Sequence, residues 1–343
     1  MRTALFLLAG ALMSGGCHAE GQPPKPTVAE PTVAEPTVAE PTVAEPRERA
    51  PDPELVAALR GHVQVLAGEI GGRGIGPGDA GTSTLDAAAA YLRQQWTAQG
   101  YEVHAQAYTV GEQQVENLFV RVPGRSPALV VVGAHYDTCD GNPGADDNAS
   151  GVAALLELSR RLAATEPERT LHLVAFANEE PPYFKDPQTM GSAVHARALR
   201  EQGEEVEAML SLESIGYFSD VRGSQHYPAI LAPLYPETGD FVAVVGKNGS
   251  RPLVRRVVRG LETHGPIPVE SIAAPASITG IDWSDHWSFW REGWAQAVMV
   301  TDTATYRNPN YHEMSDLPET LDYRRLALVT EALEATIREL AGS

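Results

Sequence analysis

The chain has very few cysteines and no long apolar segment, and both shortages restrict what it can be. Cys17 and Cys139 are the only cysteines in 343 residues, so no disulfide framework can stabilise the fold. The apolar run near the N-terminus is too short for a permanent membrane-spanning helix. Basic residues are also scarce, because 26 Lys and Arg stand against 45 Asp and Glu, a net charge of −19. Binding to nucleic acid is therefore not expected, since phosphate contacts need clustered Lys and Arg.

Two common hydrolase motifs are missing as well. G-x-S-x-G does not occur, which disfavours a serine hydrolase. H-E-x-x-H does not occur either, which disfavours a single-zinc protease of the helix-borne type. The apolar content of 43% is normal for a globular protein, and the length suits one large or two ordinary domains.

The N-terminal segment 1–17 reads MRTALFLLAGALMSGGC and resembles a bacterial lipoprotein signal. One Arg precedes the short apolar run, and small residues lead to Cys17, which would become the acylated first residue of the mature protein. Ser14 departs from the pattern, which has an aliphatic residue at that position. The alternative is an ordinary secretory signal cleaved near Ala19. We expect an exported bacterial protein, anchored in a membrane through Cys17 and facing the periplasm or the cell surface.

Residues 18–53 form a proline-rich segment that is not expected to fold by itself. It contains four copies of Pro-Thr-Val-Ala-Glu, at 26–45. Proline at every fifth position excludes a helix and disfavours a central strand. A repeat this short cannot build a core. We expect an extended tether that holds the globular part, residues 54–343, away from the lipid anchor.

From residue 54 onwards, apolar strand-like segments alternate with segments of helical periodicity. We expect strands over 104–110, 116–122, 128–134, 171–177, 208–218, 240–246 and 295–304, and helices over 55–70, 83–101, 152–164, 192–202, 251–265 and 321–340. This alternation predicts an α/β fold, a three-layer sandwich around a mixed, mainly parallel central sheet. No polar linker interrupts the segment, which we interpret as one domain.

The segment 128–151 has the strongest functional signal in the chain. A buried apolar strand leads to His135 and Asp137, and a turn-rich stretch then leads to the adjacent pair Asp146 and Asp147. Ligands of open α/β sheets bind at the carboxyl ends of the strands. An imidazole with a neighbouring carboxylate that orients it, followed by a second carboxylate, suits a divalent cation. A histidine at a strand end taken alone is more commonly a hydrogen-bonded core residue.

The two motifs in this order, H-x-D and then G-x-x-D-[DN]-x-S-G, resemble the co-catalytic dizinc aminopeptidases of metallopeptidase family M28. The resemblance covers roughly 54–343 and implies the fold of a zinc-dependent exopeptidase with two Zn²⁺ ions per chain. On the family pattern His135 ligates one zinc, Asp137 is its orienting partner, and Asp147 bridges the two metals.

Other parts of the family pattern occur later in the chain. Glu179 corresponds to the general base and Glu180 to a metal ligand. Glu213 stands where many relatives have Asp as a terminal ligand, and His312 corresponds to the late histidine ligand. The resemblance implies that His135 pairs with Glu213 on one metal, and His312 with Glu180 on the other.

Further candidates near the site are less strongly indicated. Tyr311 and Asp285 could support the metal ligands or stabilise an oxyanion. His286 could be a ligand on spacing alone, but the family pattern favours a packed side chain. Cys139 could be a soft zinc ligand, although a small loop residue is the favoured interpretation.

The resemblance implies hydrolysis of the first peptide bond of peptide substrates, by water that two metal ions activate and Glu179 deprotonates. Zinc is favoured over magnesium because the ligand set mixes imidazole with carboxylate. Carboxypeptidases share the fold, and so do glutaminyl cyclases, which use a single zinc and perform no hydrolysis. Another alternative is a noncatalytic surface lipoprotein that binds peptides, but no position of the pattern is missing here.

Overall fold

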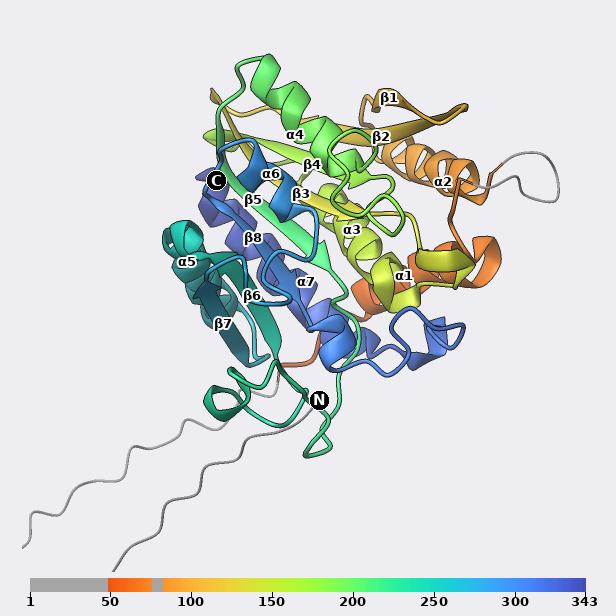
Figure 1. Ribbon diagram of the computed structural model, residues 1–343. Helices are drawn as coiled ribbons and strands as arrows, with labels where there is room; N and C mark the ends of the chain where they lie inside the picture. Colours follow the sequence, from red (N-terminus) through yellow and green to blue (C-terminus); the bar gives the residue numbers. More distant parts are fainter. Residues whose placement is uncertain (1–48, 76–82) are drawn as a thin grey trace, which may run out of the picture. The chain divides into compact units, whose positions relative to one another are not determined.

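The computed structural model describes residues 49–75 and 83–343, and its centre is one eight-stranded sheet (Figure 1). The strands are β1 (His104–Val110), β2 (Gln113–Val122), β3 (Ser126–His135), β4 (Arg169–Phe176), β5 (Val206–Glu213), β6 (Val242–Lys247), β7 (Val269–Ala274) and β8 (Ala297–Thr301). Their order is β1-β2-β4-β3-β5-β8-β6-β7. The neighbours β4, β3, β5 and β8 are parallel, whereas β1, β2 and β6 each pair antiparallel with a neighbour. The sheet is therefore mixed, with a parallel centre, as predicted.

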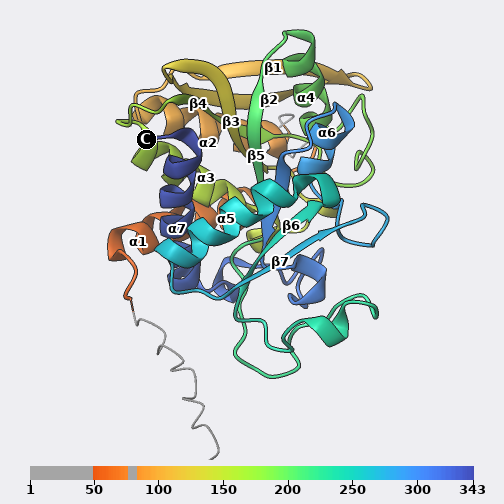
Figure 2. The same ribbon diagram turned by 90° about the vertical axis from the view of Figure 1, so that its left-hand side faces the viewer.

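Helices cover both faces of this sheet. They are α1 (Pro53–Val63), α2 (Thr84–Ala98), α3 (Gly151–Leu162), α4 (Gly191–Glu201), α5 (Arg251–His264), α6 (His286–Arg291) and α7 (Tyr323–Ala341). One buried apolar cluster joins α1, α2, α3, α5 and α7 to one face, and a second cluster joins α4 and α6 to the other. Figure 2 shows the two groups of helices on opposite sides of the sheet. The three-layer α/β prediction is confirmed.

The central strand β3 illustrates why the sequence folds this way. Val130 and Val132 belong to the first apolar cluster, and Leu129 and Val131 belong to the second. A strand that is buried on both faces carries a continuous apolar run instead of an alternating one. The helix α2 begins with a capping box, in which the Ser83 side chain accepts from the Asp86 amide and Asp86 accepts in return.

Three details differ from the sequence-based expectation. The strand expected over 208–218 ends at Glu213, because Ser214 adopts a φ of 45° and its amide bonds to a loop side chain instead of a strand. The edge strand β7 was not expected, since its side chains are only partly buried and its apolar pattern is weak. The short helix α6 was not expected either.

The N-terminal predictions concern residues that the structure does not describe. The signal segment 1–17 with Cys17 and the repeats at 26–45 lie outside the described residues. Among the helices that are described, none is long and apolar enough to cross a membrane.

Candidate metal centre

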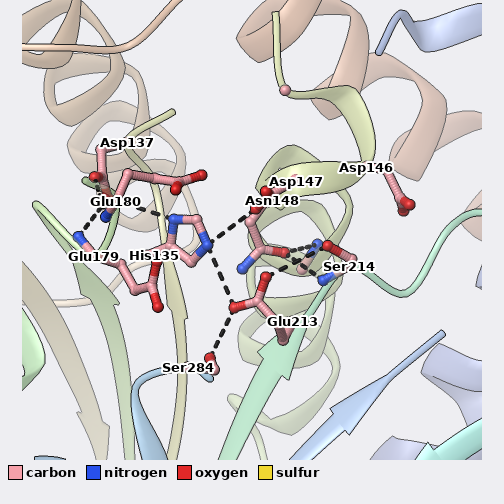
Figure 3. A network of polar contacts seen from close by, with 12 residues as sticks. His135, Asp137, Asp146, Asp147, Asn148, Glu179, Glu180, Glu213, Ser214 and Ser284 are labelled. Carbon is pink, nitrogen blue, oxygen red and sulfur yellow. Dashed lines mark hydrogen bonds and ion pairs between the residues drawn. The ribbon is translucent and has the colours of Figure 1, made fainter. Parts of the chain in front are cut away.

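The parallel strands β3, β4 and β5 deliver polar side chains to one edge of the sheet. His135 is the last residue of β3, Glu213 is the last residue of β5, and Glu179 and Glu180 follow β4. Because parallel strands end at the same edge, these four side chains converge (Figure 3). The loop before α3 adds Asp147 to the group.

Asp147 lies opposite His135, and Glu213 completes this first set. The Nε2 atom of His135 is 3.2 Å from Asp147 Oδ1 and 3.3 Å from Glu213 Oε2. All three side chains are buried, and their donor atoms lie within 4.8 Å of one another. One imidazole and two carboxylates therefore face a common point.

The second carboxylate oxygen of Asp147 faces a different histidine. His312, from the segment between β8 and α7, has its Nε2 atom 3.1 Å from Asp147 Oδ2 and 3.2 Å from Glu180 Oε2. Asp147 thus stands between two imidazole–carboxylate sets and offers one oxygen to each. The structure brings together all five residues that the family pattern suggested as ligands.

The donor atoms of these sets have the properties expected of metal ligands. His135 Nε2, Asp147 Oδ1, Glu180 Oε1 and His312 Nε2 are buried and form no hydrogen bond within the described part of the chain. Buried polar atoms without partners are costly unless a further group satisfies them. A mixture of imidazole and carboxylate donors suits zinc. The residues present therefore fit a zinc ion in each set.

Asp137 holds three of the neighbouring groups in place. Its Oδ1 atom accepts from the amide of Glu179 at 3.1 Å, and its Oδ2 atom accepts from the amide of Glu180 at 3.0 Å. The Nδ1 atom of His135 lies 3.4 Å from Oδ1. One carboxylate thus orients an imidazole and the backbone that carries both glutamates.

The loop that carries Asp147 is tied to the end of β5 by its own side chains. Asn148 donates to the carbonyl of Leu212 and accepts from the amide of Ser214, and Ser150 accepts from the amide of Ile215. These contacts explain the N-x-S part of the motif, because they fix Asp147 beside Glu213.

Asp146 takes a different direction from Asp147. It accepts hydrogen bonds from the amide of Gly216 and from the Asn308 side chain, and Figure 3 shows it away from His135. Asp146 thus serves the loops around the site and does not face either histidine.

Two further residues that support the loop had no clear sequence signal. Arg73 is fully buried, and its guanidinium donates to the carbonyls of Tyr136, Pro143 and Gly144. Asp316 accepts from the amides of Asp146 and Asp147. Arg73 lies in a glycine-rich segment before α2. Nothing in its local sequence indicates that it packs against a segment 70 residues away.

Several residues at the candidate metal centre have a left-handed backbone conformation. Asn178, immediately before the glutamate pair, has a φ of 57°, and His312 has a φ of 61°. Ser214, directly after Glu213, is also in the left-handed region. This region is uncommon for residues other than glycine. Three such residues, one of them a candidate ligand and two adjacent to one, show that the chain turns sharply where the side chains must be aimed.

Burial and mutual charge shift the acids of the site in opposite directions. Burial raises the pKa of Glu179 well above its usual range, and although His135 lowers it, Glu213 and Glu180 raise it further. Burial and Asp147 raise the pKa of Glu180 to about 8, against the opposing effect of His312. Burial alone would raise the pKa of Asp147, but the two histidines that face its oxygens outweigh this effect and lower the pKa.

The less strongly indicated candidates lie around this centre. Tyr311 stacks on the ring of His312 with centroids 3.9 Å apart. Asp285 is fully buried, neither of its oxygens has a hydrogen-bond partner among the described residues, and burial raises its pKa to about 7. The Nε2 atom of His286 donates to the carbonyl of Ile281, and the ring packs edge-on against Trp290, as expected of a packed side chain.

Cys139 is a buried free thiol near the second set. Its sulfur lies within 4.8 Å of donor atoms of Glu180 and His312.

An α/β sandwich with imidazole and carboxylate donors at the carboxyl edge of its parallel strands is the architecture of the zinc-dependent exopeptidases. The sequence profile of peptidase family M28 matches residues 117–337, which is more than half of the chain. The protein belongs to peptidase family M28.

Individual relatives agree with this assignment. The chain is 39% identical over 258 residues to YfbL, an uncharacterized protein of Escherichia coli K12, with 73% of this chain and 78% of YfbL covered. It is 28% identical over 232 residues to a probable leucine aminopeptidase of Arthroderma benhamiae, covering 64% of this chain. The match spans only 56% of that aminopeptidase.

Solved structures show the same fold. LapB from Legionella pneumophila aligns with a TM-score of 0.66 at 22% identity, over 84% of this chain and 72% of LapB. The zinc aminopeptidase BSAP from Bacillus subtilis aligns with a TM-score of 0.66 at 15% identity, over 83% and 94% of the two chains. A glutaminyl cyclase from Porphyromonas gingivalis aligns with a TM-score of 0.63 at 18% identity, over 83% and 97%.

Proposed function

We propose that this protein is a zinc-dependent aminopeptidase that removes N-terminal residues from peptides and holds two zinc ions. The observation that carries the proposal is the position of Asp147, between His135 and His312 with one oxygen toward each. Glu213 completes one set and Glu180 the other. The leucine aminopeptidases among its relatives and the fold shared with a zinc aminopeptidase support the same function.

The proposed division of labour follows from the donor atoms. His135 and Glu213 would hold one zinc ion, His312 and Glu180 would hold the other, and both ions would share Asp147. Bound zinc supplies Lewis-acid activation of a water molecule and of the scissile carbonyl. Asp137 keeps His135 and the two glutamates in position through the hydrogen bonds described above.

Glu179 is proposed as the general base. Its carboxyl group is buried beside the first donor set, and no hydrogen bond from the described residues engages its oxygens, whereas its amide is held by Asp137. The carboxylate accepts a proton from the attacking water and returns it to the leaving amine. Tyr311, which stacks on His312 at the edge of the site, is proposed to bind the polarised carbonyl oxygen. Asp285 is proposed as a buried support for Glu179, because its charge raises the pKa of Glu179.

Glutaminyl cyclases have the same fold, so the experiment must separate the two reactions. The full-length protein is assayed for zinc content and for products from matched peptides with a free N-terminus, an acetylated N-terminus, an amidated C-terminus or an N-terminal glutamine. We expect two zinc ions per chain and release of N-terminal amino acids from all peptides except the acetylated one.

Other outcomes would contradict the proposal in different ways. One zinc ion with conversion of N-terminal glutamine to a ring would indicate a cyclase. Loss of cleavage only after C-terminal amidation would indicate a carboxypeptidase. A zinc-loaded protein that binds peptides without releasing any product would indicate a noncatalytic binding protein.

We also propose that the protein is exported and anchored in a membrane through a lipid on Cys17. In this proposal residues 18–53 form the tether, and residues 54–343 form the catalytic domain. Support comes from the sequence pattern of residues 1–17 and the proline repeats at 26–45.

A further inference from the structure

A cavity of about 110 Å³ adjoins the candidate metal centre, on the sheet face that carries α4 and α6. Glu213 and Tyr311 line one part of it. Its walls are largely apolar, with Phe241, Val245, Ile272 and Met299 among the lining residues. The cavity also contains one carboxylate that the proposed chemistry does not use, that of Glu270 on β7.

The strand registers show how Glu270 is placed relative to the metal centre. Glu213 lies opposite Thr301 on β8, Thr301 lies opposite Ala243 on β6, and Ala243 lies opposite Glu270. Residues that are directly opposite on neighbouring strands point to the same face of a sheet. The four residues thus form one row across the cavity floor. Three strand spacings of about 4.8 Å place the Cα atoms of Glu213 and Glu270 about 14 Å apart.

Within residues 49–75 and 83–343, Glu270 has no partner of opposite charge. Among the described residues it forms neither an ion pair nor a hydrogen bond, and its side chain is half-buried. Burial raises the pKa of Glu270, and the charges of Asp240 and Glu262 raise it further. A carboxylate in this setting is stabilised by any cation that enters the cavity.

Two tyrosines give the same end of the cavity a surface that suits a cation. Tyr227 and Tyr235 both line the cavity and stack with ring centroids 5.5 Å apart. Their hydroxyl groups donate to the carbonyls of Pro236 and Ser271, which holds the rings in place. Burial raises the pKa of both tyrosines, and Glu270 contributes to both shifts, so the carboxylate lies near the two rings. Aromatic faces attract guanidinium and ammonium groups.

We infer that this cavity receives the side chain of an N-terminal arginine or lysine, with Glu270 as the residue that determines specificity. The apolar walls contact the methylene stem of the substrate side chain. The cationic end lies between Glu270 and the tyrosine pair. The inference rests on the proposed aminopeptidase function, because it assigns the N-terminal residue of the substrate to this cavity.

The test compares substrates that differ at the N-terminal side chain. Arginine, lysine and norleucine para-nitroanilides are assayed with the full-length protein and with Glu270→Gln. Norleucine has the linear stem of lysine without the charge. The variant Glu262→Gln is the matched control, because Glu262 is exposed on α5, influences Glu270 only through its charge and does not line the cavity.

We expect the native protein to prefer arginine and lysine to norleucine in kcat/KM. Glu270→Gln should lower kcat/KM for the two basic substrates about tenfold to a hundredfold, mainly through KM, since Gln keeps an acceptor oxygen but loses the negative charge that strengthens the contact with a cation. Norleucine turnover should change less than twofold in Glu270→Gln, and Glu262→Gln should leave the substrate preference unchanged. Two results would overturn the inference and leave the aminopeptidase proposal intact. One is a preference of the native protein for norleucine, and the other is an unchanged substrate preference in Glu270→Gln.

Binding provides a readout that does not depend on turnover. In calorimetric titrations of the zinc-loaded protein, free L-arginine should bind more tightly than L-norleucine, and Glu270→Gln should remove the difference. If no substrate is cleaved, the aminopeptidase proposal fails, and these titrations still decide whether Glu270 selects a cationic side chain. Equal binding of the two amino acids to the native protein would refute that selection.

Discussion

Replacement of Asp137 by Asn tests how much the candidate site depends on one buried carboxylate. Asp137 accepts from the amides of Glu179 and Glu180 with different oxygens. Asn has the same shape but only one acceptor oxygen. Whichever way its amide group is turned, one of the two buried backbone N–H groups then faces an NH₂ group instead of an oxygen.

The magnitude follows from that count of hydrogen bonds. A hydrogen bond to a charged acceptor contributes about 1.5–3 kcal/mol, and a buried donor left without a partner costs about 1–3 kcal/mol. Asp137→Asn should therefore lower the free energy of unfolding of the zinc-free protein by about 3–5 kcal/mol. Because His135 also loses its orienting carboxylate, zinc affinity should fall about tenfold to a hundredfold.

Urea unfolding of the zinc-free protein measures the stability change, and competition with a chelator measures zinc affinity. The matched control is Asp140→Asn, which makes the same chemical change at an exposed residue of the following loop, where φ is 44° and Asn is tolerated. Asp140→Asn should leave both quantities within about 0.5 kcal/mol of the native protein. If Asp137→Asn behaved like this control, the orienting role of Asp137 would be refuted.

Three further predictions test separate parts of the reasoning. Glu179→Gln should retain both zinc ions and lower kcat about 10²–10⁴-fold, whereas Glu180→Ala should lower the zinc content toward one ion per chain. Metal analysis and steady-state kinetics of both variants measure these effects. The opposite pattern would show that the roles of general base and ligand are reversed. Burial, with Arg121 contributing, lowers the pKa of His195 from 6.5 to about 3, so the folded state needs the neutral ring. The contribution of His195 to the free energy of unfolding is therefore complete above pH 6.5 and is lost as the pH falls toward 3. In urea unfolding, lowering the pH from 7 to 5 should cost the native protein about 2 kcal/mol more than it costs His195→Gln. Equal losses in the two proteins would contradict this prediction. Cys17→Ser should move the protein from the membrane fraction to the soluble fraction without changing turnover, and unchanged fractionation would exclude the lipid anchor.

Much of the fold could be predicted because its sequence signals are local. The continuous apolar runs of the central parallel strands and the helical periodicity of α3, α5 and α7 indicate these elements without tertiary information. The signals are weaker at the edges of the sheet. Strand β7 is short and only partly buried, so neither its length nor its apolar pattern distinguishes it from a loop.

The candidate metal ligands and their pairing were suggested by motif order and the family resemblance, but the backbone turns that aim these side chains were not. Glu213 ends a strand, and its expected continuation to residue 218 was wrong because the following amides bond to Asn148 and Ser150. The buried guanidinium of Arg73 also escaped prediction, since its partners are carbonyl groups and carbonyls carry no signal in a sequence.

The sequence by itself determined the class of fold, the order of the central strands along the chain and the residue types available for a metal centre, because each depends on neighbouring residues or on a short motif. The resemblance already implied that Asp147 stands between the two sets, but only the tertiary structure showed that Asp146 turns toward the Gly216 amide and the Asn308 side chain. The same holds for the row from Glu213 to Glu270, which spans four strands brought together by the sheet order β5-β8-β6-β7. The physical reason is that sheet pairing joins segments far apart in the chain, and no local pattern specifies which strands become neighbours.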